Sequence, residues 1–217
     1  NEPGPMELSL PGIEAIGGSR IFFVDRYDQP ASIYDIDFKP IAGANQHPEG
    51  VGLTEVDHLT NNVFRGRMDY WARFYERLFN FREIRHFDIQ GQQTGLTSRA
   101  MTAPDDKIRI PLNEEARGAG EGQIEEFLMQ YNGEGIQHIA FACTDLVATA
   151  QRLRANGVPL LAVPENYYDD LLAKTDLAPE LVDTLRAHDI FYDREGEAEY
   201  FQVYTRTLEN RFFFEIV

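Results

Sequence analysis

The feature that most limits the possible folds is an internal repeat, because one order of predicted elements, a strand, a helix and then further strands, occurs twice. In the first copy, a strand at 54–63 is followed by an amphipathic helix at 66–80. In the second copy, a strand at 135–145 is followed by a helix at 145–157. A repeat of this length takes precedence in choosing a fold. We therefore expect an α+β fold in which paired βαβββ modules form an open barrel of mixed sheet around one cleft.

Further strands complete each copy. Strand patterns occur at 81–89, 95–103 and 107–112, and again at 158–164, 190–196, 199–207 and 211–217. A helical insertion at 165–189 follows the first strand of the later group. The modules span about 53–131 and 132–217, and together they form the catalytic domain that we predict at 51–217.

Residues 1–50 differ from the rest of the chain. A strand is predicted at 19–27, no other strand signal precedes it, and the sequence then becomes rich in proline and glycine. A single strand needs a sheet to join, so we expect 1–50 to be the end of an N-terminal domain plus a linker. The chain stops directly after a strand, so we also expect a C-terminal segment beyond Val217.

Charge and composition argue against several classes of function. Acidic residues number 36 against 20 basic ones, and a net charge of −16 disfavours binding to nucleic acid or to an anionic membrane. No apolar run approaches the roughly 20 residues that span a bilayer. The sequence has no glycine-rich phosphate loop, nucleophile elbow or CxxC pair. Its single cysteine excludes an internal disulfide and fits the reducing cytoplasm.

Two histidines and one glutamate form a candidate metal site. His58 and His138 occupy the same position in the first strand of each module, 80 residues apart. Glu215 lies in the apolar final strand, where a buried carboxylate is costly unless it is paired or bound to a metal. Two imidazoles and one carboxylate bind one face of an octahedral ion and leave three positions open, which is typical of non-haem Fe(II) oxygenases. The pattern predicts a ferrous ion here.

Simpler interpretations exist for each of these residues. A histidine in an apolar strand is more often a hydrogen-bonded core residue than a ligand, and Glu215 could pair with Arg206 or Arg211. The recurrence of histidine at one place in both modules is what favours the metal site. His47, His86 and His188 have no such counterpart, and we interpret them as solvated or structural residues.

Five polar residues lie where a strand or loop faces the predicted cleft. Amides and hydroxyls fix the orientation of ligands in mostly apolar pockets. Taken singly, each of the five is explained as well by ordinary turn or edge chemistry. The five are Ser98, Asn113, Gln123, Gln137 and Gln202.

At these residues the sequence resembles the 4-hydroxyphenylpyruvate dioxygenase family of the vicinal oxygen chelate superfamily, whose fold is glyoxalase- and bleomycin-resistance-like. The resemblance runs from Gly17 to Val217. It is carried by the segments VDHLTNNV, GLTSRAMTAPDDKIRIPLNEE, GQIEEFLMQYNGEGIQHIAF, PENYYDDL, FQVYT and FFFEIV. It implies that His58, His138 and Glu215 are the metal ligands. It further implies a substrate pocket made by Ser98, Asn113, Gln123, Gln137, Gln202 and Phe213.

The resemblance also implies an activity. A cytoplasmic homo-oligomer, a dimer or tetramer, would use Fe(II) to convert 4-hydroxyphenylpyruvate and O₂ to homogentisate and CO₂, in the catabolism of tyrosine and phenylalanine. The metal centre would carry the reaction, with no separate acid or base. The family has an N-terminal module, of which we expect only the last strand here, and a C-terminal helix that follows the final strand and is not expected in this chain.

Three other activities stay open. A 4-hydroxymandelate synthase would use the same substrate and iron ligands but would oxidise the benzylic carbon. An extradiol dioxygenase would cleave a catechol ring on a similar fold. The chain could also be an inactive metal-binding fragment.

Overall fold

A computed structural model describes residues 8–25, 30, 32–90, 95–116 and 122–217. The chain divides into two units, residues 1–50 and residues 51–217, which are described separately. Among the described residues, no helix is both long enough and apolar enough to cross a membrane.

The first unit contains more regular structure than the sequence indicated. Strand β1 (Gly12–Glu14) pairs antiparallel with β2 (Arg20–Phe22), and a 3₁₀ turn, η1 (Ile16–Gly18), lies between them. The expectation that no strand precedes β2 was therefore wrong. A short helix, α1 (Ile33–Asp37), interrupts the predicted linker. Its start is held by Asp35, whose carboxylate accepts hydrogen bonds from the backbone N–H and the hydroxyl of Ser32.

The second unit is built on one sheet of eight strands, in the order β4-β5-β6-β3-β7-β10-β9-β8. The first strands of the two modules, β3 and β7, pair antiparallel at its centre, and each is joined on its other side by the last strand of its own module in parallel. This arrangement confirms the predicted α+β fold with paired modules and a mixed sheet. The strands are β3 (Leu53–Asn62), β4 (Arg82–Gln90), β5 (Gly95–Thr102), β6 (Arg109–Glu115), β7 (Gly135–Cys143), β8 (Phe191–Glu195), β9 (Ala198–Tyr204) and β10 (Phe213–Ile216).

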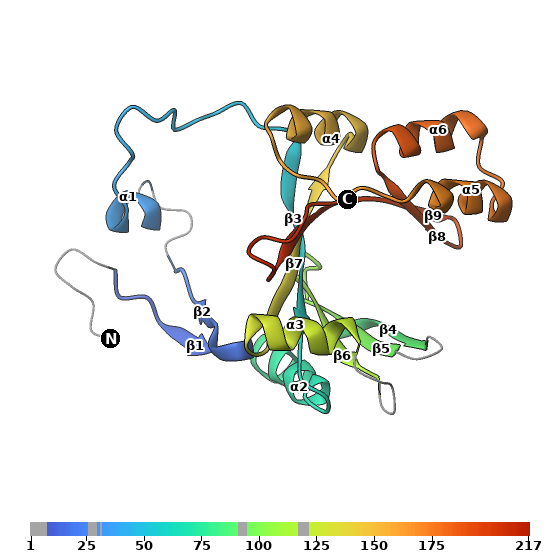
Figure 1. Cartoon of the computed structure of the whole chain (residues 1–217). Coiled ribbons are helices and arrows are strands. Elements are labelled where there is room, and N and C mark those ends of the chain that lie inside the picture. Colours follow the sequence, from blue (N-terminus) through green and yellow to red (C-terminus); the bar gives the residue numbers. More distant parts are fainter. Residues whose placement is uncertain (1–7, 26–29, 31, 91–94, 117–121) are drawn as a thin grey trace. The chain divides into compact units, whose positions relative to one another are not determined.

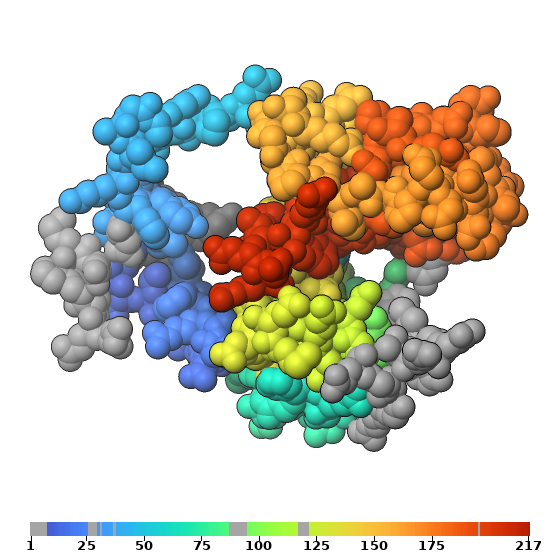
Figure 2. All heavy atoms as spheres, viewed as in Figure 1, coloured from blue at the N-terminus to red at the C-terminus, as the bar shows by residue number. Residues whose placement is uncertain are grey.

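In the described part of this unit five helices accompany the sheet, and Figure 1 shows that they divide between the modules. Helices α2 and α3 lie beside the strands of the first module, whereas α4, α5 and α6 lie beside those of the second. On the face shown in Figure 2, the segment that ends in β10 lies between α3 and the later helices. The helices are α2 (Met68–Phe79), α3 (Gln123–Tyr131), α4 (Leu146–Ala155), α5 (Glu165–Lys174) and α6 (Pro179–Ala187).

Local chemistry explains where the helices begin and end. The carboxylate of Asp145 accepts a hydrogen bond from the backbone N–H of Ala148 and caps α4. Asn80 ends α2 in the left-handed conformation, with φ of 56°. The first backbone N–H of α2, at Met68, donates to the buried carboxylate of Glu114 at 2.9 Å. This bond ties the start of the helix to β6.

Among the described residues, apolar clusters pack the helices of both modules against the sheet. The larger cluster packs α4, α5 and α6 around fully buried Tyr168, Val182 and Val203. A smaller one surrounds Ile124 and Leu128 of α3. Because the helices take up these apolar surfaces, the facing side chains of β3, β7 and β10 remain for the site described below.

One strand of the second module is much shorter than expected. At 158–164 the chain forms only a single bridge, between Leu160 and Thr205. Pro159 and Pro164 bracket this bridge, and neither can donate a backbone hydrogen bond to a neighbouring strand. The second module is therefore completed by β8, β9 and β10 alone.

Candidate metal centre

The register of three adjacent strands brings His58, His138 and Glu215 together. His58 on β3 and Glu215 on β10 are both paired with Ala140 of β7, from opposite sides. His138 precedes Ala140 by two positions, so it points to the same face of the sheet. The side chain of Ala140 is small and fully buried, and it leaves the space above it to the three larger groups.

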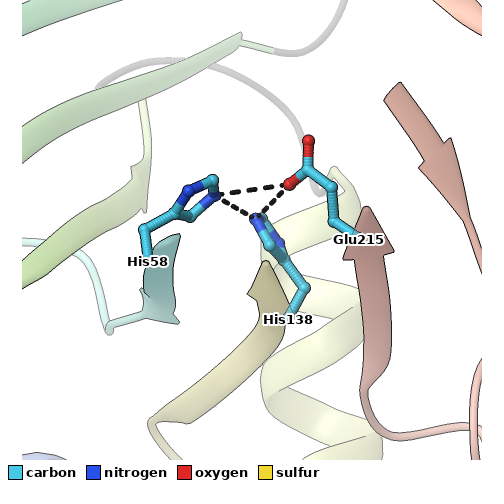
Figure 3. A group of neighbouring side chains, drawn as sticks. All are labelled: His58, His138 and Glu215. Atoms are coloured by element: carbon cyan, nitrogen blue, oxygen red, sulfur yellow. Dashed lines mark hydrogen bonds and ion pairs between the residues drawn. The ribbon is translucent and has the colours of Figure 1, made fainter. Parts of the chain in front are cut away.

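Figure 3 shows the three side chains pointing toward one another. The Nε2 atoms of the two histidines lie 3.2 Å apart. Oε2 of Glu215 lies 3.3 Å from Nε2 of His58 and 3.1 Å from Nε2 of His138. Glu215 is 4% exposed. Its ion-pair partners, among the described residues, are these two histidines rather than Arg206 or Arg211.

Neighbouring side chains determine which nitrogen of each ring carries the proton. Nδ1 of His58 lies 2.8 Å from Oδ1 of Asp57, and Nδ1 of His138 lies 2.9 Å from Oε1 of Gln137. Both partners are acceptor oxygens, so each Nδ1 donates. In a neutral ring Nε2 then turns a lone pair toward Glu215, and in a protonated ring Nε2 donates to that carboxylate. When both rings are neutral, three acceptor atoms lie this close together and need positive charge between them, from protons or from a metal cation. Two imidazole nitrogens and a carboxylate suit a divalent first-row transition metal.

The pKa values show how strongly the site favours positive charge. Burial alone would raise the pKa of Glu215, but hydrogen bonds with His138 and His58 outweigh it and lower that pKa to about 2. Burial likewise would lower the pKa of His58, but Asp57 and Glu215 raise it to about 9. Glu215 is therefore an anion at neutral pH. A metal cation and a proton compete for the same nitrogen of His58.

Aromatic and polar side chains of the second module surround the three groups. Phe213 stacks on the ring of His138, with centroids 5.0 Å apart and planes 20° apart. The hydroxyl of Tyr204 lies 2.8 Å from Oε1 of Gln202 and 3.3 Å from Oε1 of Glu215. Phe213 and Gln202 thus lie close to the candidate ligands.

Tyr204 was missed by sequence reasoning. Its pairing with Glu215 across β9 and β10 could have revealed it, had that register been known. Burial and the charge of Glu215 raise the pKa of Tyr204, so the phenol stays protonated. Tyr204 and Phe213 also line a mostly apolar cavity of about 510 Å³, whose other lining residues include Leu161, Phe191 and Arg206.

The remaining predicted pocket residues differ in their surroundings. Ser98 and Asn113 pair across β5 and β6, and the Asn113 amide donates to Oδ1 of Asn62 at 3.4 Å. Asn62 lies four positions after His58, on the same face of β3. Gln123 is the first residue of α3 and is exposed. The substrate contacts of these residues stay predictions.

Two protein families match parts of this sequence. Residues 55–197 match the family described as the glyoxalase/bleomycin resistance protein/dioxygenase superfamily. Residues 1–39 match the N-terminal family of hydroxyphenylpyruvate dioxygenase.

The sequence relatives include two bacterial enzymes. The chain is 52% identical to the 4-hydroxyphenylpyruvate dioxygenase of Pseudomonas sp. (strain P.J. 874), over 100% of the chain and 62% of that protein. It is 48% identical to the 4-hydroxyphenylpyruvate dioxygenase of Pseudomonas aeruginosa, over 97% of the chain and 59% of that protein. The chain therefore spans about three-fifths of the length of these relatives.

A solved structure of similar fold is a variant of 4-hydroxymandelate synthase from Streptomyces coelicolor. The TM-score is 0.77 at 25% identity, and the match covers 94% of this chain and 59% of that one.

Proposed function

The chain belongs to the glyoxalase/bleomycin resistance protein/dioxygenase superfamily, and from this premise we propose that residues 51–217 form the catalytic domain of an Fe(II)-dependent 4-hydroxyphenylpyruvate dioxygenase. Residues 1–50 are then the end of an N-terminal domain and its linker. The enzyme converts 4-hydroxyphenylpyruvate and O₂ to homogentisate and CO₂, in tyrosine and phenylalanine catabolism. It is a cytoplasmic homo-oligomer, a dimer or tetramer.

The observation that carries this proposal is the convergence of three acceptor atoms from three strands. Nε2 of His58, Nε2 of His138 and Oε2 of Glu215 lie within 3.1 to 3.3 Å of one another. These residues would hold the ferrous ion. When bound, the ion supplies the redox chemistry toward dioxygen that amino-acid side chains lack.

The residues of the chain would bind and orient the substrate. The ring of Phe213 is fixed against His138 and offers an apolar face to an aromatic ring. Gln202 is held by the hydroxyl of Tyr204, so its amide keeps one orientation toward the substrate. Ser98 and Asn113 present a hydroxyl and an amide from the first module. The apolar cavity beside Phe213 would exclude water from the reacting groups.

Product identification tests the reaction itself. The intact protein is loaded with Fe(II) under anaerobic conditions and then mixed with 4-hydroxyphenylpyruvate and O₂. We expect homogentisate and CO₂ in equal amounts. Formation of 4-hydroxymandelate would instead assign the second candidate activity, which the likeness to the Streptomyces coelicolor enzyme favours. If a catechol is supplied in place of 4-hydroxyphenylpyruvate, its consumption without release of CO₂ would indicate ring cleavage. Bound iron without turnover of either compound would indicate an inactive fragment.

Metal content tests the ligands. We expect His58→Ala, His138→Ala and Glu215→Ala each to lose stoichiometric iron. His86→Ala is a matched control, because His86 lies on β4 beside Glu83 and outside the three converging groups. Full iron content in any of the three ligand variants contradicts the assignment.

A further inference from the structure

The residue before His58 interrupts the pairing of the central strands. On β3, Val56 is paired with Phe141 of β7, and His58 is paired with Ala140. Two steps along β3 thus correspond to one step along β7. Asp57 is the extra residue, which makes it the centre of a β-bulge.

The residue before His138 interrupts the same pairing from the side of β7. On β7, His138 is paired with Thr60, and Ile136 is paired with Asn61. Here two steps along β7 correspond to one step along β3, and Gln137 is the extra residue. The two central strands therefore carry matching bulges, one directly before each histidine.

The bulges explain a contact that a regular strand does not allow. Consecutive side chains of a regular strand point to opposite faces, so a residue cannot reach the ring that follows it. Here Oδ1 of Asp57 lies 2.8 Å from Nδ1 of His58, and Oε1 of Gln137 lies 2.9 Å from Nδ1 of His138. The extra residue turns its side chain toward the histidine of the same strand.

We propose that Asp57 and Gln137 are positioning residues, which the two bulges place so that each keeps the proton of its neighbouring histidine on Nδ1 and turns Nε2 toward Glu215. This inference rests on the proposed metal site. A partner of this kind fixes the orientation of a ligand ring and raises its basicity toward the metal.

Arg109 extends this arrangement in the first module. Its Nη1 atom lies 2.7 Å from Oδ2 of Asp57, while Oδ1 of the same carboxylate contacts His58. Both oxygens of Asp57 are therefore engaged, and the carboxylate cannot rotate away from the ring without losing an ion pair. Arg109 comes from β6, so a third strand holds the orientation of His58.

The two positioning residues are chemically unequal. Asp57 places a full negative charge beside its histidine, whereas Gln137 offers a neutral amide oxygen. A charged acceptor makes the stronger hydrogen bond and increases the basicity of its ring more. Gln137 was predicted to bind substrate. Its carbonyl oxygen is engaged by His138, so any substrate contact falls to its amide NH₂ group.

Cobalt binding tests the inference separately from turnover. Co²⁺ is added to the metal-free intact protein in competition with a chelator, and the dissociation constant and the visible absorption spectrum are recorded. We expect Asp57→Ala to weaken Co²⁺ binding by about 10- to 100-fold and to change the spectrum. Asp57→Asn keeps an acceptor oxygen and should recover part of the affinity, and Gln137→Ala should weaken binding less than Asp57→Ala.

Glu55→Ala is the matched control, because Glu55 is an exposed carboxylate on the same strand. Circular dichroism confirms that each variant is folded. If Asp57→Ala binds Co²⁺ with wild-type affinity and an unchanged spectrum, the inference is overturned. If His58→Ala loses Co²⁺ binding in the same experiment, the proposed metal site is still supported. A wild-type protein that binds no Co²⁺ overturns the proposed function and this inference together.

Discussion

The two modules share one frame but contribute unequally to the candidate site. Each provides a histidine at the same place, and only the second provides a carboxylate. In the second module, β10 sets Glu215 beside Ala140, two residues after His138. In the first, β6 pairs Leu112 with Asn61 and Asn113 with Asn62; continued one residue beyond these pairs, the same register would set Pro111 opposite Thr60, two residues after His58.

Pro111 thus takes the place that Glu215 has in the other module, and proline has no ligand atom. The duplication supplies two equivalent imidazoles. Because the corresponding position is glutamate in one module and proline in the other, only one carboxylate joins them. A symmetric site with two carboxylates would leave fewer coordination positions open. The asymmetry therefore suits a metal that must also bind substrates.

The largest effect should come from removing the one unequal ligand. Glu215→Gln preserves shape but removes the charge, and it should weaken Fe(II) binding by more than the roughly 10- to 100-fold that outer partners contribute. Pro111→Ala, at the corresponding position, should retain stoichiometric iron. Metal analysis of both purified variants gives the answer. Equal iron loss in the two would mean that the modules are equivalent at this position.

Ala140 provides the next test, because it lies between His58 and Glu215 with a side chain that is 0% exposed. Ala140→Leu should push the two ligands apart and abolish metal binding, with an overpacking cost of about 1–3 kcal/mol in the free energy of unfolding. Ala142→Leu, two positions further along β7, is the control and should bind metal normally. Normal metal binding by Ala140→Leu would show that this residue does not set the spacing.

The sequence predicted the parts of this site that depend on local pattern. Strand alternation and the repeat made His58, His138 and Glu215 candidates, with core and ion-pair alternatives open, and the structure brings the three together. Matching strands of the duplicated modules pair at the centre of the sheet, so the proximity of the two histidines follows from the repeat itself.

Features that depend on pairing between distant strands were not predictable. Tyr204 contacts Glu215 only because β9 and β10 adopt one particular register. The bulges at Asp57 and Gln137 leave no signal in the alternation of apolar residues, since both bulged residues are polar like many surface positions. The start of α3 at Gln123 was also not fixed by the local pattern, and the predicted substrate contact of this residue stays a prediction.

The cores of the two modules should differ in how polar groups support them. In the first, the backbone N–H of Phe64 and the indole N–H of Trp71 donate, at 3.0 Å and 2.9 Å, to the buried carboxylate of Glu134, which lies just before β7 at the start of the second module. Glu134→Gln replaces one acceptor oxygen with a donor, and should lower the free energy of unfolding by about 1–3 kcal/mol.

The comparison in the second module is Tyr168, whose buried hydroxyl makes one hydrogen bond, to the carbonyl of Ile190 at 3.3 Å. Tyr168→Phe should cost only about 0.5–1.5 kcal/mol. Urea unfolding measures both variants. A larger loss of unfolding free energy for Tyr168→Phe than for Glu134→Gln would contradict the expectation that buried polar groups contribute more to the core around α2 than to the core around α5.

The smallest effect on stability is expected at a position where the two modules differ only in a small apolar side chain. Cys143 lies five residues after His138, and its counterpart five residues after His58 is the fully buried Val63. Burial raises the pKa of the Cys143 thiol, so it stays neutral and packs as a small apolar group against the cluster around α4. Cys143→Val makes the two positions identical, and it should change the free energy of unfolding by less than about 1 kcal/mol, because the change adds only about one methyl group at a partly buried position. A loss well beyond that value would mean that the thiol has a specific role in the second module, and that this position, like Glu215, distinguishes the two halves.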